Sequence, residues 1–274
     1  QAEAYSECCD GYIQAFKIKE GNANTYYNAA CCASLAGNFE LALDWLNKTA
    51  ALGWTNKQWM MNDGDLKALH DVEGWNDVLQ AVQANIDIIE KDYDKPLQKR
   101  LEAIYVKDQT LRQLISDAEK KFGEDSPEMN YYWGLMAQED SLNELEVIAI
   151  IDEFGWPGKS LVGGKANTAV WLVIQHASLE LQEKYLPLMR ASVEKGESQG
   201  NHLALLEDRI QMYQGKPQVY GSQITKNMET NEWKLHELIE PEYVDQRRAA
   251  VGLGPLSEYV MRWNIVFDVP QKVK

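Results

Sequence analysis

The sequence predicts a mainly α protein with two parts: short helical hairpins over residues 1–92, and a larger helical domain over 93–274 that carries one β-hairpin near 218–238. Three observations support this prediction. Apolar residues recur at helical spacing through most of the 274 residues. Gly or Asn follows several of these periodic segments, as is usual at helix C-termini. The pattern changes to alternation in only one region, between 218 and 238.

The first part predicts short helices that end at glycine. A glycine just past the last helical turn can adopt the left-handed conformation that closes a helix. The expected helices cover residues 5–19, 25–36 and 39–52, and the glycines that end them are Gly21, Gly37 and Gly53.

Small and aromatic residues are spaced regularly through the second and third of these helices: Tyr26, Ala30, Gly37, Phe39, Ala42 and Leu46. The pattern resembles one tetratricopeptide repeat, in which small side chains allow two helices to pack closely. Thr49 stands where that repeat usually has Ala, and Trp54 where Pro is common. The next stretch resembles the cap that closes such arrays, on Asp63, Asp65, Leu66, Leu69 and Trp75. The resemblance implies a helical surface that binds a protein or peptide partner.

Four cysteines form two vicinal pairs, Cys8-Cys9 and Cys31-Cys32. Neither zinc sites nor thioredoxin-type redox sites use this spacing. If the first two helices form an antiparallel hairpin, the pairs lie at similar height, and a disulfide from Cys9 to Cys31 or Cys32 is possible. The alternative is that all four are small apolar core residues. The disulfide state stays open.

The second part predicts longer helices, the first of which begins near Lys95 and Pro96. Asp108 lies on the apolar stripe of this helix, where a carboxylate is costly unless it is paired, and Arg112 follows one turn later. The other helices are expected over 127–154, 168–185, 187–196, 202–213, 244–251 and 255–267, with strands over 218–225 and 232–238.

A rigid loop, Gly155-Trp156-Pro157-Gly158, separates two of these helices and is followed by Lys159 and Ser160. Gly-Lys-Ser also occurs in phosphate-binding loops. The first Gly of that motif is missing here at the required spacing, and no strand precedes the loop. The sequence therefore does not predict a nucleotide site of this kind.

Polar residues interrupt the apolar stripes throughout this second part. They comprise Asp108-Gln109, Arg112, Gly155-Trp156-Pro157, Gln175-His176, Asp208-Arg209, Gly215, Gln218, Tyr220-Gly221-Ser222-Gln223, Val244-Asp245 and Arg247-Arg248. The combination, over residues 101–260, resembles an uncharacterised bacterial family, a domain of unknown function. Ser222 replaces the expected Thr, and Ser178 replaces an expected Asp near His176. The resemblance implies no activity.

These polar residues are the candidate site. The candidates are Asp108, Gln109, Arg112, Gln175, His176, Asp208, Arg209, Tyr220, Gln223, Asp245, Arg247 and Arg248. One hypothesis is a buried network that locks helices together through Arg–carboxylate pairs. The other is a pocket for a small polar or anionic ligand. Arg112, Arg209 and Arg248 would clamp the ligand, and His176 would transfer protons. Gln175, Tyr220 and Gln223 would then hydrogen-bond the ligand. If the residues converge, their charges nearly balance or are slightly positive.

For function, the sequence favours a non-enzymatic binding or scaffold protein that uses the surface of residues 1–92 and this polar pocket. The alternative is a hydrolase that uses His176 with the Asp/Arg cluster. Ser222 is the candidate nucleophile, but it lacks the G-x-S-x-G elbow. We expect no metal, because the four His lack ligand spacing, and no cofactor.

The charge of −15 argues against a nucleic-acid partner. We expect no membrane span, because the longest apolar stretch, near 169–174, is too short to cross a bilayer. The first residue is Gln1, which we interpret as a sign of export to the periplasm or the extracellular space, with a cytoplasmic location left open.

Overall fold

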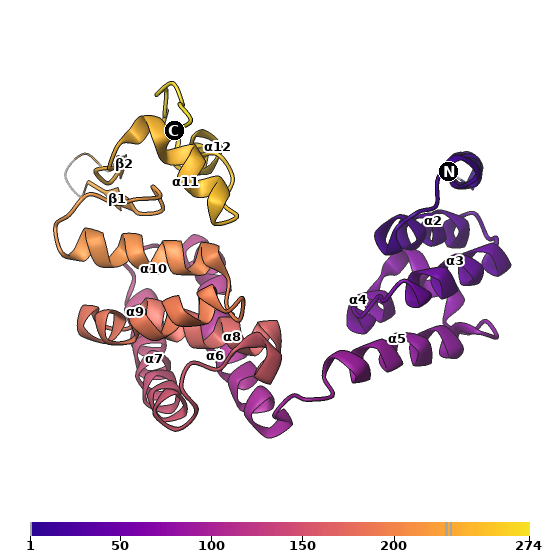
Figure 1. Cartoon of the computed structure of the whole chain (residues 1–274), viewed down its shortest axis with the longest axis horizontal. Helices are drawn as coiled ribbons and strands as arrows, with labels where there is room; N and C mark the ends of the chain where they lie inside the picture. Colours follow the sequence, from indigo (N-terminus) through magenta and orange to yellow (C-terminus); the bar gives the residue numbers. More distant parts are fainter. Residues whose placement is uncertain (1, 228–229, 231) are drawn as a thin grey trace. The chain divides into compact units, whose positions relative to one another are not determined.

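A computed structural model describes residues 2–227, 230 and 232–274. Helices dominate it, which confirms the mainly α prediction (Figure 1). The chain forms two compact units, Gln1–Asp92 (unit 1) and Tyr93–Lys274 (unit 2). No described helix has the length and apolar content needed to cross a bilayer.

Unit 1 is a series of short helices around its own core. The elements are α1 Ala2–Ile18, α2 Ala23–Leu35, α3 Phe39–Ala51, α4 Lys57–Asn62, the 3₁₀ helix η1 Gly64–Leu69, and α5 Trp75–Ile89. Ala30 on α2 and Ala42 on α3 are fully buried, so the two helices approach closely, as the sequence predicted. Leu46, Leu66 and Leu69 fill the rest of this core.

Asparagine caps fix where these short helices begin. The side chains of Asn22, Asn38 and Asn56 each accept a hydrogen bond from the backbone amide three residues later. Gly37 and Gly53, just after α2 and α3, have φ of 77° and 87°, which a residue with a side chain rarely adopts. Helix ends are thereby set by local chemistry at both termini.

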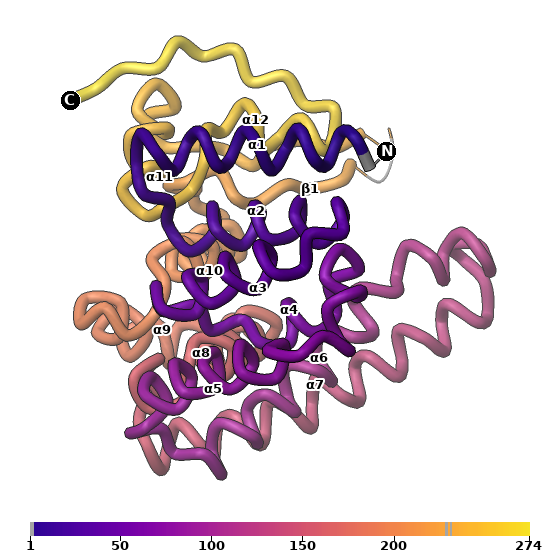
Figure 2. The backbone as a smooth tube through the Cα atoms, turned by 90° about the vertical axis from the view of Figure 1, so that its right-hand side faces the viewer, coloured from indigo at the N-terminus to yellow at the C-terminus, as the bar shows by residue number. Residues whose placement is uncertain are grey.

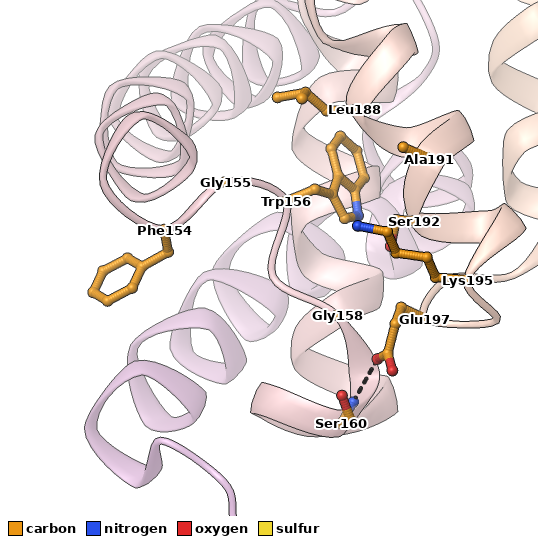
Figure 3. Close-up of a pocket in the computed structure, with 10 residues that line it drawn as sticks. All are labelled: Phe154, Gly155, Trp156, Gly158, Ser160, Leu188, Ala191, Ser192, Lys195 and Glu197. Carbon is orange, nitrogen blue, oxygen red and sulfur yellow. Dashed lines mark hydrogen bonds between the residues drawn. The ribbon is translucent and has the colours of Figure 1, made fainter.

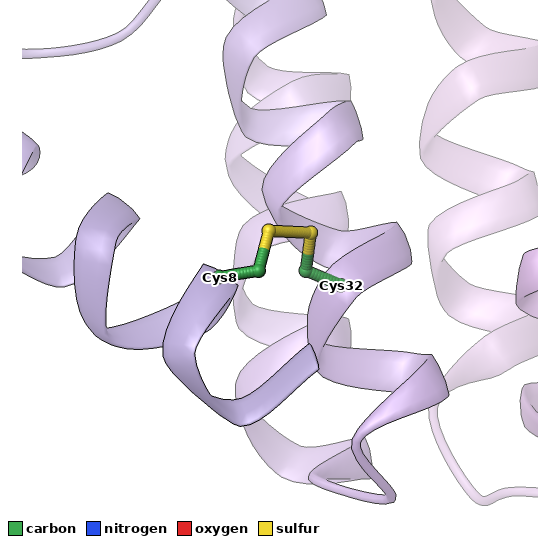
Figure 4. The surroundings of a disulfide bond; sticks show 2 residues. All are labelled: Cys8 and Cys32. Atoms are coloured by element: carbon green, nitrogen blue, oxygen red, sulfur yellow. A yellow bond between two sulfur atoms is a disulfide. The ribbon is translucent and has the colours of Figure 1, made fainter. Parts of the chain in front are cut away.

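A disulfide links α1 to α2 (Figure 4). It joins Cys8 to Cys32, whose Cα atoms are 6.0 Å apart. The disulfide between the first two helices that the sequence allowed is present, but through Cys8 rather than Cys9, so the alternative of four unpaired core cysteines is wrong. Cys9 and Cys31 are free and buried in the core of unit 1. The side chains of neighbouring helical residues point about 100° apart. One cysteine of each pair therefore faces the core, and the other faces the partner helix and forms the disulfide.

Unit 2 is built on five helices: α6 Lys95–Phe122, α7 Pro127–Phe154, α8 Lys159–His176, α9 Leu179–Glu194 and α10 Gly200–Tyr213. The two longest, α6 and α7, run beside each other (Figures 1 and 2). The core contains most of α8, which is buried on nearly every side from Ala169 to Gln175. Gly163, with φ of 81°, kinks α8 near its start.

The helix expected over 168–185 is instead two helices. His176 ends α8, and Ser178 begins α9 by accepting a hydrogen bond from the amide of Leu181. The buried Gln182 amide donates to the carbonyls of Gln175 and Ala177, which satisfies the end of α8. Pro187 lies inside α9 rather than at the start of a new helix.

The C-terminal segment contains the β-hairpin. Strands β1 Ile224–Lys226 and β2 Trp233–Leu235 pair antiparallel, and both are shorter than expected. Met228, Glu229 and Asn231, which the sequence placed between the strands, lie outside the described residues. The remaining elements are the 3₁₀ helix η2 Pro241–Tyr243, α11 Val244–Ala250, α12 Leu256–Val260 and the 3₁₀ helix η3 Met261–Trp263. The helix expected over 255–267 therefore stops early, at Asn264, whose φ is 56°.

Candidate functional site

Asp108 and His176 meet in unit 2. Asp108 on α6 is only 1% exposed, and its Oδ1 lies 3.1 Å from Nδ1 of His176, the last residue of α8. The side chain of His176 remains 22% exposed. Gln109 donates to the other carboxylate oxygen at 2.7 Å. The buried carboxylate thus orients an imidazole that solvent can reach.

Asp108 carries its charge despite its burial. Burial alone would raise the pKa of this carboxyl. The hydrogen bond and charge of His176, the Gln109 amide and the Arg112 guanidinium outweigh that effect, and the pKa lies below its ordinary value. The predicted pairing of Asp108 with Arg112 is present, at 3.1 Å.

Arg112 has a second carboxylate partner that the sequence analysis did not identify. Its Nη2 donates to both oxygens of Asp140 on α7, at 2.9 and 2.8 Å. Its Nη1 also donates to the backbone carbonyl of Asp108. Because two carboxylates already neutralise this guanidinium, Arg112 has little attraction left for an anionic ligand.

A cavity of about 10 Å³ lies beside His176. Its lining is Asp108, Asp140, Asn143, Glu144, Val173, His176 and Ala177. Asn143 is 1% exposed, and neither its amide nitrogen nor its oxygen has a partner among the described residues. Three acidic side chains line the cavity, so this region is more negative than the balanced site that we expected. Its volume suits roughly one water molecule.

The sequence analysis predicted the helix over 127–154 but did not identify Asp140, Asn143 and Glu144 as site residues. A signal was present: Met129, Met136 and Ile150 are buried at intervals of seven, and Asn143 occupies the remaining position of that series. A polar residue on a buried stripe is the same pattern that identified Asp108.

Arg209, Gln175 and Gln223 form a neighbouring group. Arg209 donates to the carbonyl of Gln175 at 2.8 Å and to the side chain of Gln223 at 3.4 Å. Gln223 in turn donates to Ser222 Oγ at 2.9 Å. Burial lowers the pKa of Arg209 from its ordinary value. These contacts join α8, α10 and the segment before β1.

Asp208 is fully buried and anchors the loop after α10. Its carboxylate accepts hydrogen bonds from the backbone amides of Val219, Tyr220 and Ser222, at 2.7 to 3.2 Å. The Tyr-Gly-Ser-Gln motif therefore supplies backbone donors to Asp208. The side chain of Tyr220 is half-buried, and burial raises its pKa.

The residues of α11 also bind backbone. Arg247 donates to the carbonyls of Val219, Ile239 and Glu240. Arg248, 2% exposed, donates to the carbonyls of Tyr220 and Gly254. Asp245 accepts from the amide of Leu256. The twelve candidate residues therefore separate into a group around His176, a group around Arg209, and a set that holds C-terminal segments.

The loop at Trp156 (Figure 3) is held by side chains from α8 and from the connection between α9 and α10. Trp156 donates to Ser198 at 3.1 Å, and Asn167 donates to the carbonyl of Pro157 at 2.8 Å. The carboxylate of Glu197 accepts from the amide of Ser160, in the first turn of α8 (Figure 3). A carboxylate thus occupies the position that a phosphate would need.

Residues 95–272 match the model of a family of unknown function, DUF6624. The chain belongs to this family. The match spans all twelve candidate residues, from α6 to the C-terminal segment, so unit 2 is the DUF6624 domain. No family match supports the tetratricopeptide resemblance of unit 1. Searches of curated proteins and of solved structures find no match.

The Ser178 departure noted in the sequence has a structural explanation. In the DUF6624 domain Ser178 caps α9 through its hydroxyl. Asp is an equally good N-cap residue, so Ser and Asp are interchangeable for this purpose. Ser178 is exposed at the start of α9. Capping of this helix alone accounts for Ser or Asp at position 178, without a catalytic role.

Unit 1 contains a separate hollow of about 450 Å³ between α1 and the start of α3. Its lining is Ser6, Cys9, Asp10, Ile13, Ala36, Gly37, Asn38 and Leu41. A second hollow shares Asn38 and Leu41 with it and adds Glu40 and Asp44. The two hollows are called here the α1–α3 groove, which is lined by the half-buried Ile13 and Leu41 and by the exposed carboxylates of Asp10, Glu40 and Asp44.

Cys31, Asp63 and Asp65 in unit 1 hold ligand atoms within 4.8 Å of one another. Burial and the nearby carboxylates raise the pKa of the Cys31 thiol to about 12. Asp63 already accepts a hydrogen bond from the hydroxyl of Tyr27 at 2.7 Å. A metal bound here would have to displace the thiol proton and compete with the Tyr27 hydroxyl for Asp63.

Proposed function

We propose that the chain is a non-enzymatic binding or scaffold protein, and that unit 1 holds a basic peptide segment of a partner protein in the α1–α3 groove. The observation that carries this proposal is the chemistry of the groove. Ile13 and Leu41 offer apolar contact, and Asp10, Glu40 and Asp44 line the same groove. A segment that alternates apolar and basic residues complements that arrangement.

The composition of unit 1 supports the same partner. Residues 1–92 contain 14 Asp and Glu, six Lys and no Arg. Lys48 pairs with Asp44 at 3.2 Å but leaves Asp10 and Glu40 without a cation among the described residues. An excess of negative charge accelerates the approach of a basic partner and raises its affinity at low salt.

The DUF6624 domain supports binding or scaffolding over catalysis. Arg247 and Arg248 donate to backbone carbonyls, as expected of a structural network, and Arg112 is paired with two carboxylates. The cavity beside His176 is too small for a substrate. A small polar ligand remains a candidate for the exposed edge of His176, and an anionic one is disfavoured by the surrounding acids.

The proposal includes a tetratricopeptide-like architecture for unit 1 and export of the protein. The close packing of α2 on α3 supports the architecture. The Cys8–Cys32 disulfide supports export, because disulfides persist in oxidising compartments.

Fluorescence anisotropy tests the peptide proposal. The probe is a labelled octapeptide of alternating Lys and Leu, compared with one of alternating Glu and Leu. We expect the basic peptide to bind at least tenfold more tightly than the acidic one. Asp10→Lys should weaken binding of the basic peptide at least threefold. Asp71→Lys is the matched control, because it makes the same charge change on an exposed turn outside the groove. Equal weakening by both substitutions would contradict the groove as the binding site.

A second candidate function is hydrolysis, favoured by the orientation of His176 by Asp108. In this case His176 would remove a proton from water held near Asn143. The test is turnover of nitrophenyl esters by the wild type and by His176→Ala. Turnover that His176→Ala abolishes would favour this candidate, and no turnover by the wild type would exclude ester hydrolysis.

A further inference from the structure

The DUF6624 domain contains a second, larger hollow of about 490 Å³, away from the cavity beside His176. It lies between Trp171 of α8, the first turns of α10, and the segment from α11 to η3. The side chains used below are Trp171, His202, Arg248, Glu258, Tyr259 and Arg262. The volume falls within the range of small-molecule sites, about 300–1,000 Å³.

Two guanidinium groups converge on one ring in this hollow. The Cζ atoms of Arg248 and Arg262 lie 5.0 and 5.3 Å from the centre of the Tyr259 ring. Neither arginine forms an ion pair with any described carboxylate. Arg248 is 2% exposed; it donates to the carbonyls of Tyr220 and Gly254 and feels the charges of Asp245 and Asp208 beyond ion-pair distance. Because neither guanidinium is in direct contact with a described carboxylate, a bound anion would supply a charge-assisted hydrogen-bond partner.

A stacked pair of rings also lines this hollow. The rings of Trp171 and His202 stack with centroids 3.8 Å apart and planes 5° apart. Burial lowers the pKa of His202 to about 4, so the imidazole is neutral at physiological pH. An uncharged stacked pair offers a planar apolar surface to a ring.

The charge of this hollow is opposite to that of the whole chain. Among its lining residues Glu258 is the one carboxylate, against Arg248 and Arg262, and it is exposed at the edge. The hollow is therefore net positive within a protein of charge −15.

We propose that this hollow binds a small molecule that joins an anionic group, a carboxylate or a phosphate, to a planar ring. The anionic group lies between Arg248 and Arg262, and the ring lies against the wall of Trp171 and His202. This site is independent of the α1–α3 groove and of the His176 cavity.

Isothermal titration calorimetry on the full chain tests the proposal with four probes: benzoate, phenyl phosphate, inorganic phosphate and benzyl alcohol. We expect one of the two ring anions to bind, and whichever is tighter identifies the group. Inorganic phosphate, which lacks the ring, and benzyl alcohol, which lacks the charge, should bind at least tenfold more weakly. Binding by neither benzoate nor phenyl phosphate at millimolar concentration would overturn the proposal.

Arg262→Gln is the informative variant, because this exposed side chain can change without disturbing the buried network. We expect this substitution to weaken the binding of the ring anion at least tenfold. Arg100→Gln, an exposed arginine on α6 that pairs with Glu146, is the matched control and should leave binding unchanged. If the two variants bind equally, the anion does not sit in this hollow and the proposal is wrong.

Discussion

In the DUF6624 domain, Nδ1 of His176 lies 3.1 Å from Oδ1 of Asp108, and this contact ties the end of α8 to the middle of α6. The carboxylate is buried and charged, whereas the imidazole reaches solvent. Stability and the chemistry of His176 therefore depend on the same buried charge.

The first prediction concerns Asp108 and pH. Its pKa lies below the ordinary value of 3.8. The carboxyl of Asp108 therefore binds a proton at higher pH in the unfolded chain than in the folded chain. The stabilisation that ionised Asp108 gives the folded chain is complete above about pH 4, and it is lost as the pH falls through the lower pKa of the folded state. Asp108→Asn should lower the free energy of unfolding by about 1–3 kcal/mol at pH 7.

Urea unfolding at pH 7, 5, 4 and 3 measures this effect. The difference between wild type and Asp108→Asn should shrink as the pH falls below about 4. Asp117→Asn, which changes an exposed carboxylate of the same helix, is the control and should stay within about 0.5 kcal/mol of wild type. A difference for Asp108→Asn that does not change with pH would contradict the prediction.

The second prediction concerns Asp208. Three backbone amides of the loop after α10 donate to its carboxylate. Asp208→Ala would leave these buried donors without an acceptor, and we expect a loss of about 3 kcal/mol or more in unfolding free energy. Thermal unfolding by circular dichroism measures it. Asp268→Ala, in an exposed segment, should have almost no effect, and equal effects would refute the anchoring role.

Part of this arrangement could be predicted from the sequence. Asp108 interrupts an apolar stripe with Arg112 one turn later, and those two facts are local to one helix. The ends of α2 and α3 could also be predicted, because Gly37 and Gly53 act through neighbouring backbone groups, whereas α1 ends at Ile18 without a left-handed Gly21. Each of these features is decided within a few residues of chain.

The rest depended on contacts between distant segments. Asp140 meets Arg112 only because α7 packs beside α6, and Asp208 meets its donors only after the loop folds back. Arg247 looked like a ligand-binding group in the sequence, yet it donates to the backbone carbonyls of Val219, Ile239 and Glu240. Periodicity shows which face of a helix is buried, but not which polar group lies opposite.

The third prediction concerns the cysteines of unit 1. Cys8 and Cys32 form a disulfide, whereas Cys9 and Cys31 are free. Alkylation of the denatured, unreduced protein should therefore label two thiols, which peptide mass spectrometry would place at Cys9 and Cys31. Detection of no thiol, or of label on Cys8, would contradict this pairing.

Removing the disulfide should also destabilise unit 1. A closed loop of this length stabilises a folded chain by about 3 kcal/mol in the chain-entropy account. The double variant Cys8→Ser/Cys32→Ser should lose unfolding free energy of this order, as measured by urea unfolding without reductant. The same variant in reducing buffer should match reduced wild type, and a difference between them would show another effect of the substitutions.

The last prediction concerns His202, which stacks on Trp171. Burial lowers its pKa from 6.5 to about 4, so the unfolded chain binds more protons than the folded chain between these values. Its contribution to stability is complete above pH 6.5 and declines as the pH falls toward 4. The imidazole resonances of His202, assigned with His202→Gln, should keep their neutral positions from pH 8 to about 5. A transition near pH 6.5 would mean that the ring is open to water, and the flat wall of the proposed pocket would then be absent.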